Sequence, residues 1–273
     1  MKRNMTRIVT WSLALLLISQ TSFADDADLA KQLTNPVADL INFPLQYNFN
    51  DHMNPLSSGQ QSYVNIQPVI PISISCDWMM ISRTILPVID ATNPIPYSGE
   101  RFGLSDTLQS LFFSPKKPTN GIIWGVGPAL QIPTGTQELL GTGKWAAGPT
   151  LVILKMTESG WTIGALTNHL WSLGGSSGRD SMNQTFMQPF IAYTTKTAWT
   201  YTLNSESTYY WNQGDISLPL NAMISKTTKI GKQAMSFGGG IRYWVDHPDS
   251  GPRDIGYRFV VTFLFPEGKS SKA

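Results

Sequence analysis

The sequence predicts an all-β protein, a closed antiparallel transmembrane β-barrel of about 12 strands (about 10–14) with a short N-terminal helix. Charged residues make up only 14% of the chain and aromatic residues 11%, whereas soluble domains carry about 25% charged residues. After residue 18 no segment is long and apolar enough for a membrane-spanning helix, which needs about 20 residues. Segments of alternating polarity recur instead, and lipid admits only helices and closed barrels.

Residues 1–24 have the pattern of a cleaved secretory signal peptide. Lys2, Arg3 and Arg7 form a basic segment, residues 8–18 are apolar, and small residues precede the expected cleavage after Ala24. This three-part layout is typical of export signals. Its removal takes away three basic residues and leaves 17 basic against 18 acidic residues. The basic balance of the full chain therefore gives no reason to expect a nucleic-acid partner.

We divide the chain into four parts. They are the signal peptide (1–24), an N-terminal periplasmic segment (25–44), the outer-membrane barrel (45–265) and a hydrophilic C-terminal tail (266–273). Within the second part, Asn35 and Pro36 predict the N-cap and first residue of a short helix that ends at Leu40. The single cysteine, Cys76, excludes an internal disulfide and is expected at a strand end.

The strands are predicted from the alternation of apolar and polar residues along the sequence. In residues 199–211 most odd positions are aromatic or apolar, whereas the even positions are mainly Thr, Asn and Glu. Residues 122–131 and 257–265 alternate in the same way. Successive side chains of a strand point to opposite faces, so one face meets lipid and the other the lumen. Further strands are expected at 45–50, 63–75, 78–89, 105–114, 145–154, 161–173, 185–195, 216–225 and 235–245. The facing of 78–89, 105–114, 161–173 and 185–195 is left open.

The lengths of the connections between predicted strands indicate how the barrel is oriented in the membrane. Short links are expected at 75–77, 116–120, 157–160, 196–198 and 230–233, and longer ones at 51–61, 91–104, 133–143, 174–183 and 246–254. Only the link at 213–215 departs from this order. Outer-membrane barrels combine short periplasmic turns with longer external loops. We therefore expect a bacterial outer-membrane protein surrounded by outer-membrane lipid, and an even number of strands places both chain termini on the periplasmic side. A soluble β-sandwich or lipocalin-like barrel would enclose the apolar face instead.

Charged and amide side chains on the expected lumen face are the candidate selectivity residues. They are Arg83, Asn204, Glu206, Arg242, Arg258 and Gln131. A charge facing lipid near the midplane would cost about 2–4 kcal/mol, so these side chains should point inward. The strands of Arg242 and Arg258 should pair. Two roles stay open: filtering ions or binding an acidic group, and an arginine–glutamate network that braces a narrow interior.

No catalytic chemistry is predicted. The chain contains no phosphate-binding loop, no H-E-x-x-H and no cysteine cluster, so we expect no catalytic residue, metal or cofactor. His169 and Ser172 are three residues apart, and an extended strand points them to opposite sides. We interpret His169 and Trp171 as part of an interfacial aromatic girdle. The sequence therefore predicts that the protein is not an enzyme.

The last predicted strand carries an assembly signal. Residues 257–265 alternate aromatic residues and end on Phe265, which resembles the signal that outer-membrane barrel-assembly machinery reads. The usual signal stands at the chain terminus, whereas here the hydrophilic tail follows it. Barrel-assembly machinery is therefore an expected partner.

Several longer runs resemble one family. They are LTNPVADLINFPLQYNF, NIQPVIPISI, ISRTILPVID, DTLQSLFFSPKKPT, IWGVGPALQIPTGT, LGTGKWAAGPT, YTTKTAWTYTLNSESTYYW and SFGGGIRYW. These runs are similar to the outer-membrane transporter-like proteins of the Putative MetA-pathway of phenol degradation family. The resemblance implies a channel or facilitated transporter for small, hydrophobic or aromatic molecules, and it brings no catalytic motif. The alternative from the residues alone is a structural or surface-interaction barrel with a filled lumen.

Overall fold

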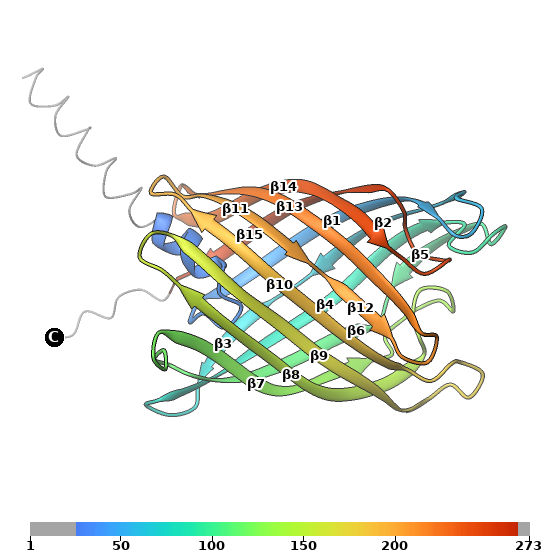
Figure 1. The fold of residues 1–273 in the computed structure, drawn as a ribbon, viewed down its shortest axis with the longest axis horizontal. Helices are drawn as coiled ribbons and strands as arrows, with labels where there is room; N and C mark the ends of the chain where they lie inside the picture. The colour runs from blue at the N-terminus through green and yellow to red at the C-terminus, as the bar shows by residue number, and fades with distance from the viewer. Residues whose placement is uncertain (1–25, 267–273) are drawn as a thin grey trace, which may run out of the picture.

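A computed structural model describes residues 26–266 as one closed β-barrel (Figure 1). The predicted signal peptide, and the tail beyond residue 266, lie outside the described residues. The strands are β1 Ile41–Met53, β2 Gly59–Ile66, β3 Val69–Ser73, β4 Trp78–Thr92, β5 Glu100–Leu104, β6 Thr107–Pro115, β7 Ile122–Ile132, β8 Lys144–Met156, β9 Trp161–Gly175, β10 Asn183–Thr194, β11 Trp199–Ser205, β12 Ser207–Tyr210, β13 Asp215–Ile230, β14 Gln233–Asp246 and β15 Ile255–Phe265.

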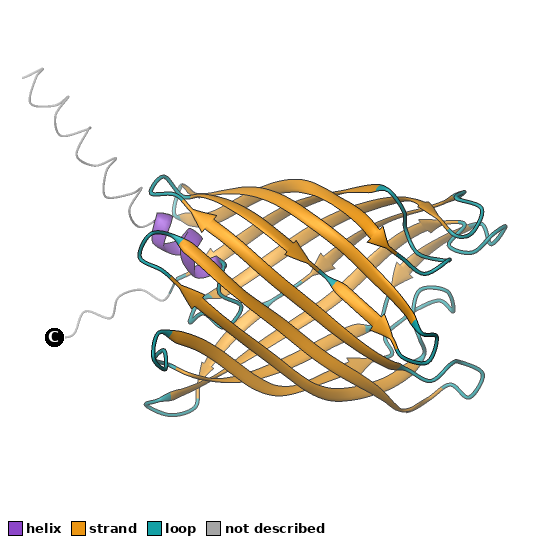
Figure 2. Cartoon of the chain, in the orientation of Figure 1, coloured by secondary structure: helices purple, strands orange, loops and turns teal. Residues whose placement is uncertain are grey.

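The fold prediction is confirmed as a closed, antiparallel 12-stranded barrel with three extra strand segments. Three barrel strands are each interrupted once, which gives the segment pairs β2/β3, β5/β6 and β11/β12. The sheet closes where β1 pairs with β15, from Ile41 opposite Phe265 to Phe49 opposite Tyr257. Closure pairs the backbone of the first and last strands and leaves no free sheet edge there. Figure 2 shows the continuous, tilted wall that results.

Prolines explain one of the interruptions. By the register of the neighbouring strands, Pro189 of β10 falls opposite Ser205, and Pro219 of β13 falls opposite Glu206. Proline has no N–H to donate to the ladder. Each neighbouring strand therefore places a proline beside the interruption, Pro189 at Ser205 and Pro219 at Glu206. The Ser205 hydroxyl donates to the Pro219 carbonyl oxygen at 2.7 Å and satisfies that acceptor.

The two barrel faces differ as the alternation predicts. In β15, Phe259 is 57% exposed on the outer face, whereas its neighbour Arg258 is 3% exposed and points inward. The structure also gives the facing of the four strands left open. Their buried inward side chains include Met79 and Ile81 in β4, Ser110, Phe112 and Ser114 in β6, Leu166, Asn168 and Leu170 in β9, and Ala192 and Thr194 in β10.

Aromatic residues gather near both rims of the outer face. At the rim with the short turns, Trp78 meets Trp124 edge to face with ring centroids 5.8 Å apart, and Trp161 lies 4.9 Å from Tyr193. At the opposite rim the aromatic pairs are His169–Trp171 and Tyr209–Trp211. Aromatic girdles at two levels with an apolar band between them are typical of transmembrane barrels.

The links differ between the two barrel ends. We call one end the short-turn end, where links such as 74–77 and 231–232 lie, and the other the long-loop end. Cys76 is exposed in the first of these turns. The first barrel strand begins at Ile41 rather than at residue 45, because its pairing with β15 continues to Phe265. The predicted loop 91–104 contains β5, which pairs with the end of β4.

The N-terminal helix lies earlier in the chain than predicted. It covers residues 26–33, whereas residues 36–40 form turns and a bend. The Asn35 side chain does accept a hydrogen bond from the Val37 backbone N–H, at 3.0 Å. This contact caps a single turn, since the chain then enters β1 at Ile41. In Figure 1 the helix sits at the short-turn end of the barrel.

Residues 26–266 include no helix of the length and hydropathy that a membrane crossing requires. The same residues contain no group of three or more His, Cys, Asp and Glu side chains arranged to hold a metal ion.

Candidate functional site

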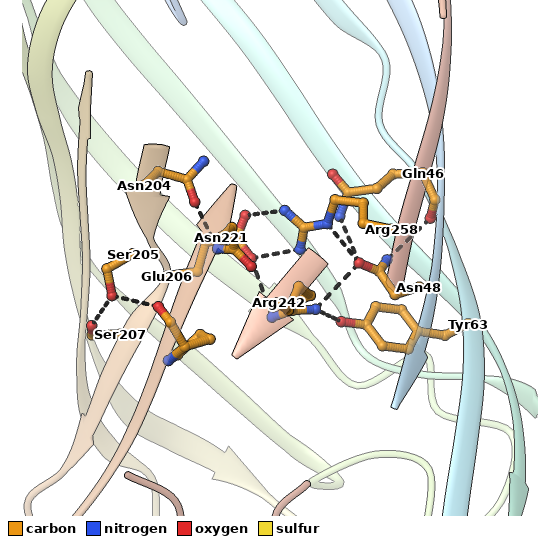
Figure 3. Close-up of polar contacts among 11 residues, drawn as sticks. Gln46, Asn48, Tyr63, Asn204, Ser205, Glu206, Ser207, Asn221, Arg242 and Arg258 are labelled. Carbon is orange, nitrogen blue, oxygen red and sulfur yellow. Dashed lines mark hydrogen bonds and ion pairs between the residues drawn. The ribbon is translucent and has the colours of Figure 1, made fainter. Parts of the chain in front are cut away.

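The charged side chains of the lumen meet at Glu206, which lies at the interruption between β11 and β12. Arg258 of β15 donates to this carboxylate twice, from Nη1 to Oε1 and from Nη2 to Oε2, both at 2.7 Å. Figure 3 shows the pair inside the barrel. Two parallel charge-assisted bonds fix both the distance and the orientation of the partners.

Arg242 of β14 joins the same group. Its Nη1 donates to the Tyr63 hydroxyl at 2.7 Å and to Asn48 Oδ1 at 3.2 Å, and its Nη2 lies 3.4 Å from Glu206 Oε2. Arg258 Nε donates to the same Asn48 oxygen at 2.7 Å. Asn48, Tyr63, Glu206, Arg242 and Arg258 form what we call the arginine–glutamate cluster. It connects side chains from the wall between β11 and β2.

Glycines lie opposite both arginines on the neighbouring strands and allow the strand backbones to approach closely. On the paired strands β14 and β15, Arg242 lies opposite Gly256 and Arg258 lies opposite Gly240. The predicted pairing of the two arginine strands is therefore confirmed. A Cβ at residue 240 would collide with the Ala222 carbonyl oxygen. Within the glycine run 238–240, Gly240 thus serves close packing within a strand.

Arg83 of β4 also points into the lumen, where Glu206 attracts it electrostatically without a direct contact. Its Nη2 donates to Gln67 Oε1 at the long distance of 3.5 Å. Among the residues that the structure describes, no carboxylate oxygen lies within 4.0 Å of Arg83. Arg83 lines two adjoining cavities of about 470 and 260 Å³.

The larger of these, which we call the lumen cavity, has a mixed lining. Its polar side chains include Gln67, Asn168 and Gln188, and its apolar side chains include Ile85, Leu166 and Phe186. Glu206 and Arg258 form part of its wall. The cavity therefore offers charge, amide groups and hydrophobic surface to one small molecule.

The N-terminal segment fills part of the lumen near the short-turn end. Val37 is 3% exposed and packs in an apolar cluster that includes Ile81, Phe112, Val152 and Leu166. The Thr34 and Thr162 hydroxyl oxygens are 2.7 Å apart. Part of the predicted N-terminal periplasmic segment, at Thr34 and Val37, thus contacts the inner wall of the barrel. Alternation could not reveal this, because the segment precedes the first strand.

Gln131, predicted as a lumen residue, does not contact the arginine–glutamate cluster in any described hydrogen bond and instead binds side chains near the long-loop end. Its Nε2 donates to Asp106 Oδ2 at 3.1 Å and to Thr142 Oγ1 at 2.9 Å. Asp106 also accepts from the backbone N–H groups of Gly135 and Thr142. The side chain is therefore part of the network that holds the loop 133–143 against the barrel.

The remaining predicted site residues lie on the lumen face. Asn204 Oδ1 accepts from Asn221 Nδ2 at 2.6 Å beside the lumen cavity, and Arg83, Glu206, Arg242 and Arg258 are described above. The site residues predicted from the sequence do not include Asn48, Tyr63, Gln67 or Asn221. The alternation in residues 43–50, where asparagine and glutamine alternate with apolar and aromatic residues, contained the signal for Asn48.

His169 and Ser172 point to opposite faces, as predicted. His169 Nδ1 lies 2.7 Å from the Thr185 hydroxyl on the outer face and beside the ring of Trp171. The Ser172 hydroxyl instead accepts from the Met182 backbone N–H. The two side chains therefore do not form a His–Ser pair.

Comparison with known protein families identifies the family of this chain. The family model described as Putative MetA-pathway of phenol degradation matches residues 79–260. The chain belongs to this family. The match begins in β4 and ends in β15, and thus includes Arg83, Glu206, Arg242 and Arg258. No curated protein matches the chain.

Three outer-membrane proteins of known structure align with this chain. An outer membrane channel from Pseudomonas putida F1 aligns with a TM-score of 0.65 at 12% identity, over 83% of this family member and 96% of that chain. The NanC porin aligns at 0.48, with 10% identity over 82% and 98% of the two chains. Outer membrane phospholipase A from Escherichia coli aligns at 0.48, with 9% identity over 83% and 90%. The first of these shows that the family member has the fold of an outer-membrane channel.

Proposed function

We propose that the barrel is an outer-membrane channel or facilitated transporter for small molecules, hydrophobic or aromatic ones in particular. The lumen cavity supports this most directly. Its volume of about 470 Å³ lies within the range of about 300–1,000 Å³ that small-molecule pockets occupy. Its mixed lining suits a molecule with an apolar body and a polar group. The family description names phenol degradation, and phenol has this character.

The outer face supports the proposed location. Apolar residues such as Leu203, Ile241 and Phe259 are about half exposed on the barrel wall, and aromatic pairs stand at both rims. Such a surface requires lipid around it. Outer-membrane lipid is thus the proposed surrounding, with the short-turn end in the periplasm. Export with a cleaved signal peptide and insertion by barrel-assembly machinery complete the proposal. No enzymatic step is part of it.

A second candidate is a barrel with a filled lumen and a structural role. The packing of Val37 among luminal side chains favours it, because this contact occupies the short-turn end. The arginine–glutamate cluster also favours it, because its hydrogen bonds link several strands of the wall across the interior. Both candidates share the fold and differ in whether solutes pass.

Osmotic swelling of proteoliposomes separates the two. Vesicles with refolded protein should swell faster in arabinose than empty vesicles, and much faster than in the larger sugar raffinose. Heat-dependent migration on a gel verifies that the barrel is folded in the same preparation. If the protein is folded but the vesicles swell no faster than empty vesicles, the transport proposal is overturned and the filled barrel is favoured.

A further inference from the structure

We infer that Arg83 forms an anion-binding site in the lumen cavity and that its ligand is a small aromatic acid. The carboxylate would bind the guanidinium, and the ring would lie against the apolar part of the wall. This inference rests on the proposed function, because it names the class of solute that the channel takes. Three observations carry it: the charge balance of the lumen, the contacts of Arg83 and the lining of the cavity.

The first observation is an excess of positive charge. Among the described residues, the charged side chains that line the lumen cavity are Arg83, Arg258 and Glu206, and Arg242 lies beside Glu206. Both oxygens of Glu206 already accept hydrogen bonds, Oε1 from Arg258 and Oε2 from Arg258 and Arg242. A carboxylate with both oxygens occupied in this way does not serve a third arginine as a direct partner. Glu206 therefore attracts Arg83 only from a distance, and the guanidinium remains open to direct contact with a ligand.

The second observation is the poor set of contacts that Arg83 makes. A guanidinium has five N–H donors, yet the one protein hydrogen bond described for Arg83 is that to Gln67 at 3.5 Å. Charged groups in protein interiors are normally paired. Arg242 shows the contrast within the same lumen, since it contacts Asn48, Tyr63 and Glu206. The free donors of Arg83 point to an anion from outside the chain.

The third observation is where Arg83 lies. It lines both adjoining cavities, so a ligand in either one reaches its guanidinium. Phe186 lines the larger cavity and Phe190 the smaller. Aromatic rings bind other rings edge to face or offset. The amides of Gln67 and Gln188 line both cavities as well and can donate to a carboxylate oxygen.

These features favour a monovalent carboxylate over other ligands. One free guanidinium matches the two oxygens of one carboxylate in a bidentate geometry. A dianionic phosphate ester would leave charge unmatched among amides and apolar groups. A cation would meet the excess positive charge and be repelled. Benzoate therefore serves as the probe, because it combines a carboxylate with a single ring.

Binding can be measured without transport. Refolded protein in a non-ionic detergent is titrated with benzoate by calorimetry, and benzyl alcohol serves as the neutral analogue. We expect Arg83→Gln to weaken benzoate binding by roughly 10- to 100-fold, as befits the loss of a charge-assisted contact. Binding of benzyl alcohol should change little. Arg83→Lys should recover part of the benzoate affinity, because lysine restores the positive charge but cannot form the bidentate hydrogen bonds of a guanidinium.

The matched control is Arg101→Gln, which removes an arginine of β5 that donates to the carbonyl oxygen of Glu100. It should bind benzoate like the parent. Acetate and chloride test for an anion without a ring, and equal competition by chloride would overturn the aromatic part of the inference. Equal benzoate binding by the parent and Arg83→Gln would overturn the site itself.

Failure of this inference and failure of the proposed function look different. A protein that accelerates arabinose swelling but ignores benzoate is a channel without the Arg83 site. A protein that binds benzoate through Arg83 but gives no swelling has the site in a closed barrel. Circular dichroism of each variant, compared with the parent, verifies that the barrel remains folded.

Discussion

Arg258 and Glu206 stand 52 residues apart in the chain, yet their side chains form a bidentate pair inside the barrel with both N–O distances at 2.7 Å. Arg258 is almost fully buried, and the Glu206 side chain is 20% exposed. A buried pair contributes to stability only when its geometry is good and its remaining hydrogen-bonding groups are satisfied. Asn48 and Arg242 supply those additional contacts.

Removing the carboxylate should therefore destabilise the barrel. Glu206→Gln leaves Arg242 and Arg258 buried without a negative charge, and breaking such a pair costs about 3–5 kcal/mol. The free energy of unfolding in detergent, from urea titration, measures the effect. Glu138→Gln is the control, because Glu138 is 82% exposed where it pairs with Arg179 and such surface pairs contribute about 0–1 kcal/mol. Equal effects of the two changes would show that the cluster does not brace the wall.

Adjacent glycines of β14 should differ in their tolerance of a side chain. A Cβ at Gly240 would collide with the carbonyl oxygen of Ala222, whereas at Gly239 it would meet the ring of Phe259 at an ordinary 3.5 Å. Gly240→Ala should lower the free energy of unfolding by about 1–3 kcal/mol, as overpacking does. Gly239→Ala should leave it nearly unchanged. The reverse order would mean that the register of β13 and β14 is wrong.

The ion preference of an open lumen should depend on Arg83 more than on residues of the lipid face. Fixed charges that line a pore set its selectivity, and Arg83 is the luminal arginine without a carboxylate partner among the described residues. Arg83→Gln should shift the reversal potential in a salt gradient toward cations. Phe259→Leu, which alters the outer face, should leave it unchanged. A shift with Phe259→Leu alone would contradict the assigned facing of β15.

The N-terminal segment should restrict passage when it is tied to the wall. The hydroxyl oxygens of Thr34 and Thr162 are 2.7 Å apart, so cysteine sulfur atoms introduced at these positions would lie near each other and could be oxidised to a disulfide. In a Cys76→Ser background, Thr34→Cys with Thr162→Cys should conduct less when oxidised than after reduction. The single variant Thr162→Cys should not respond to reductant. Equal conductance in both redox states would show that solutes pass without movement of this segment.

The barrel itself was predictable from local pattern, because lipid on one face and lumen on the other impose a two-residue period on every strand. That period placed Arg242 and Arg258 inside the barrel. It could not predict that both arginines meet Glu206, since this contact depends on how strands far apart in sequence are arranged across the lumen.

The N-terminal segment shows a second limit of local pattern. Asn35 and Pro36 have a helix-start signature, but the chain uses it for one turn before β1, and the helix lies at 26–33. The contact of Val37 with Phe112 and Val152 depends on the closed barrel around it. Such contacts follow from tertiary structure and leave no periodic trace in the sequence.

Single-channel conductance of the refolded protein in a planar bilayer tests the central claim most directly. An open lumen with a cavity of about 470 Å³ predicts discrete current steps in potassium chloride, and phenol added to the chamber should lower the current by occupying that cavity. Folded protein that inserts into the bilayer but gives no current steps would contradict the account.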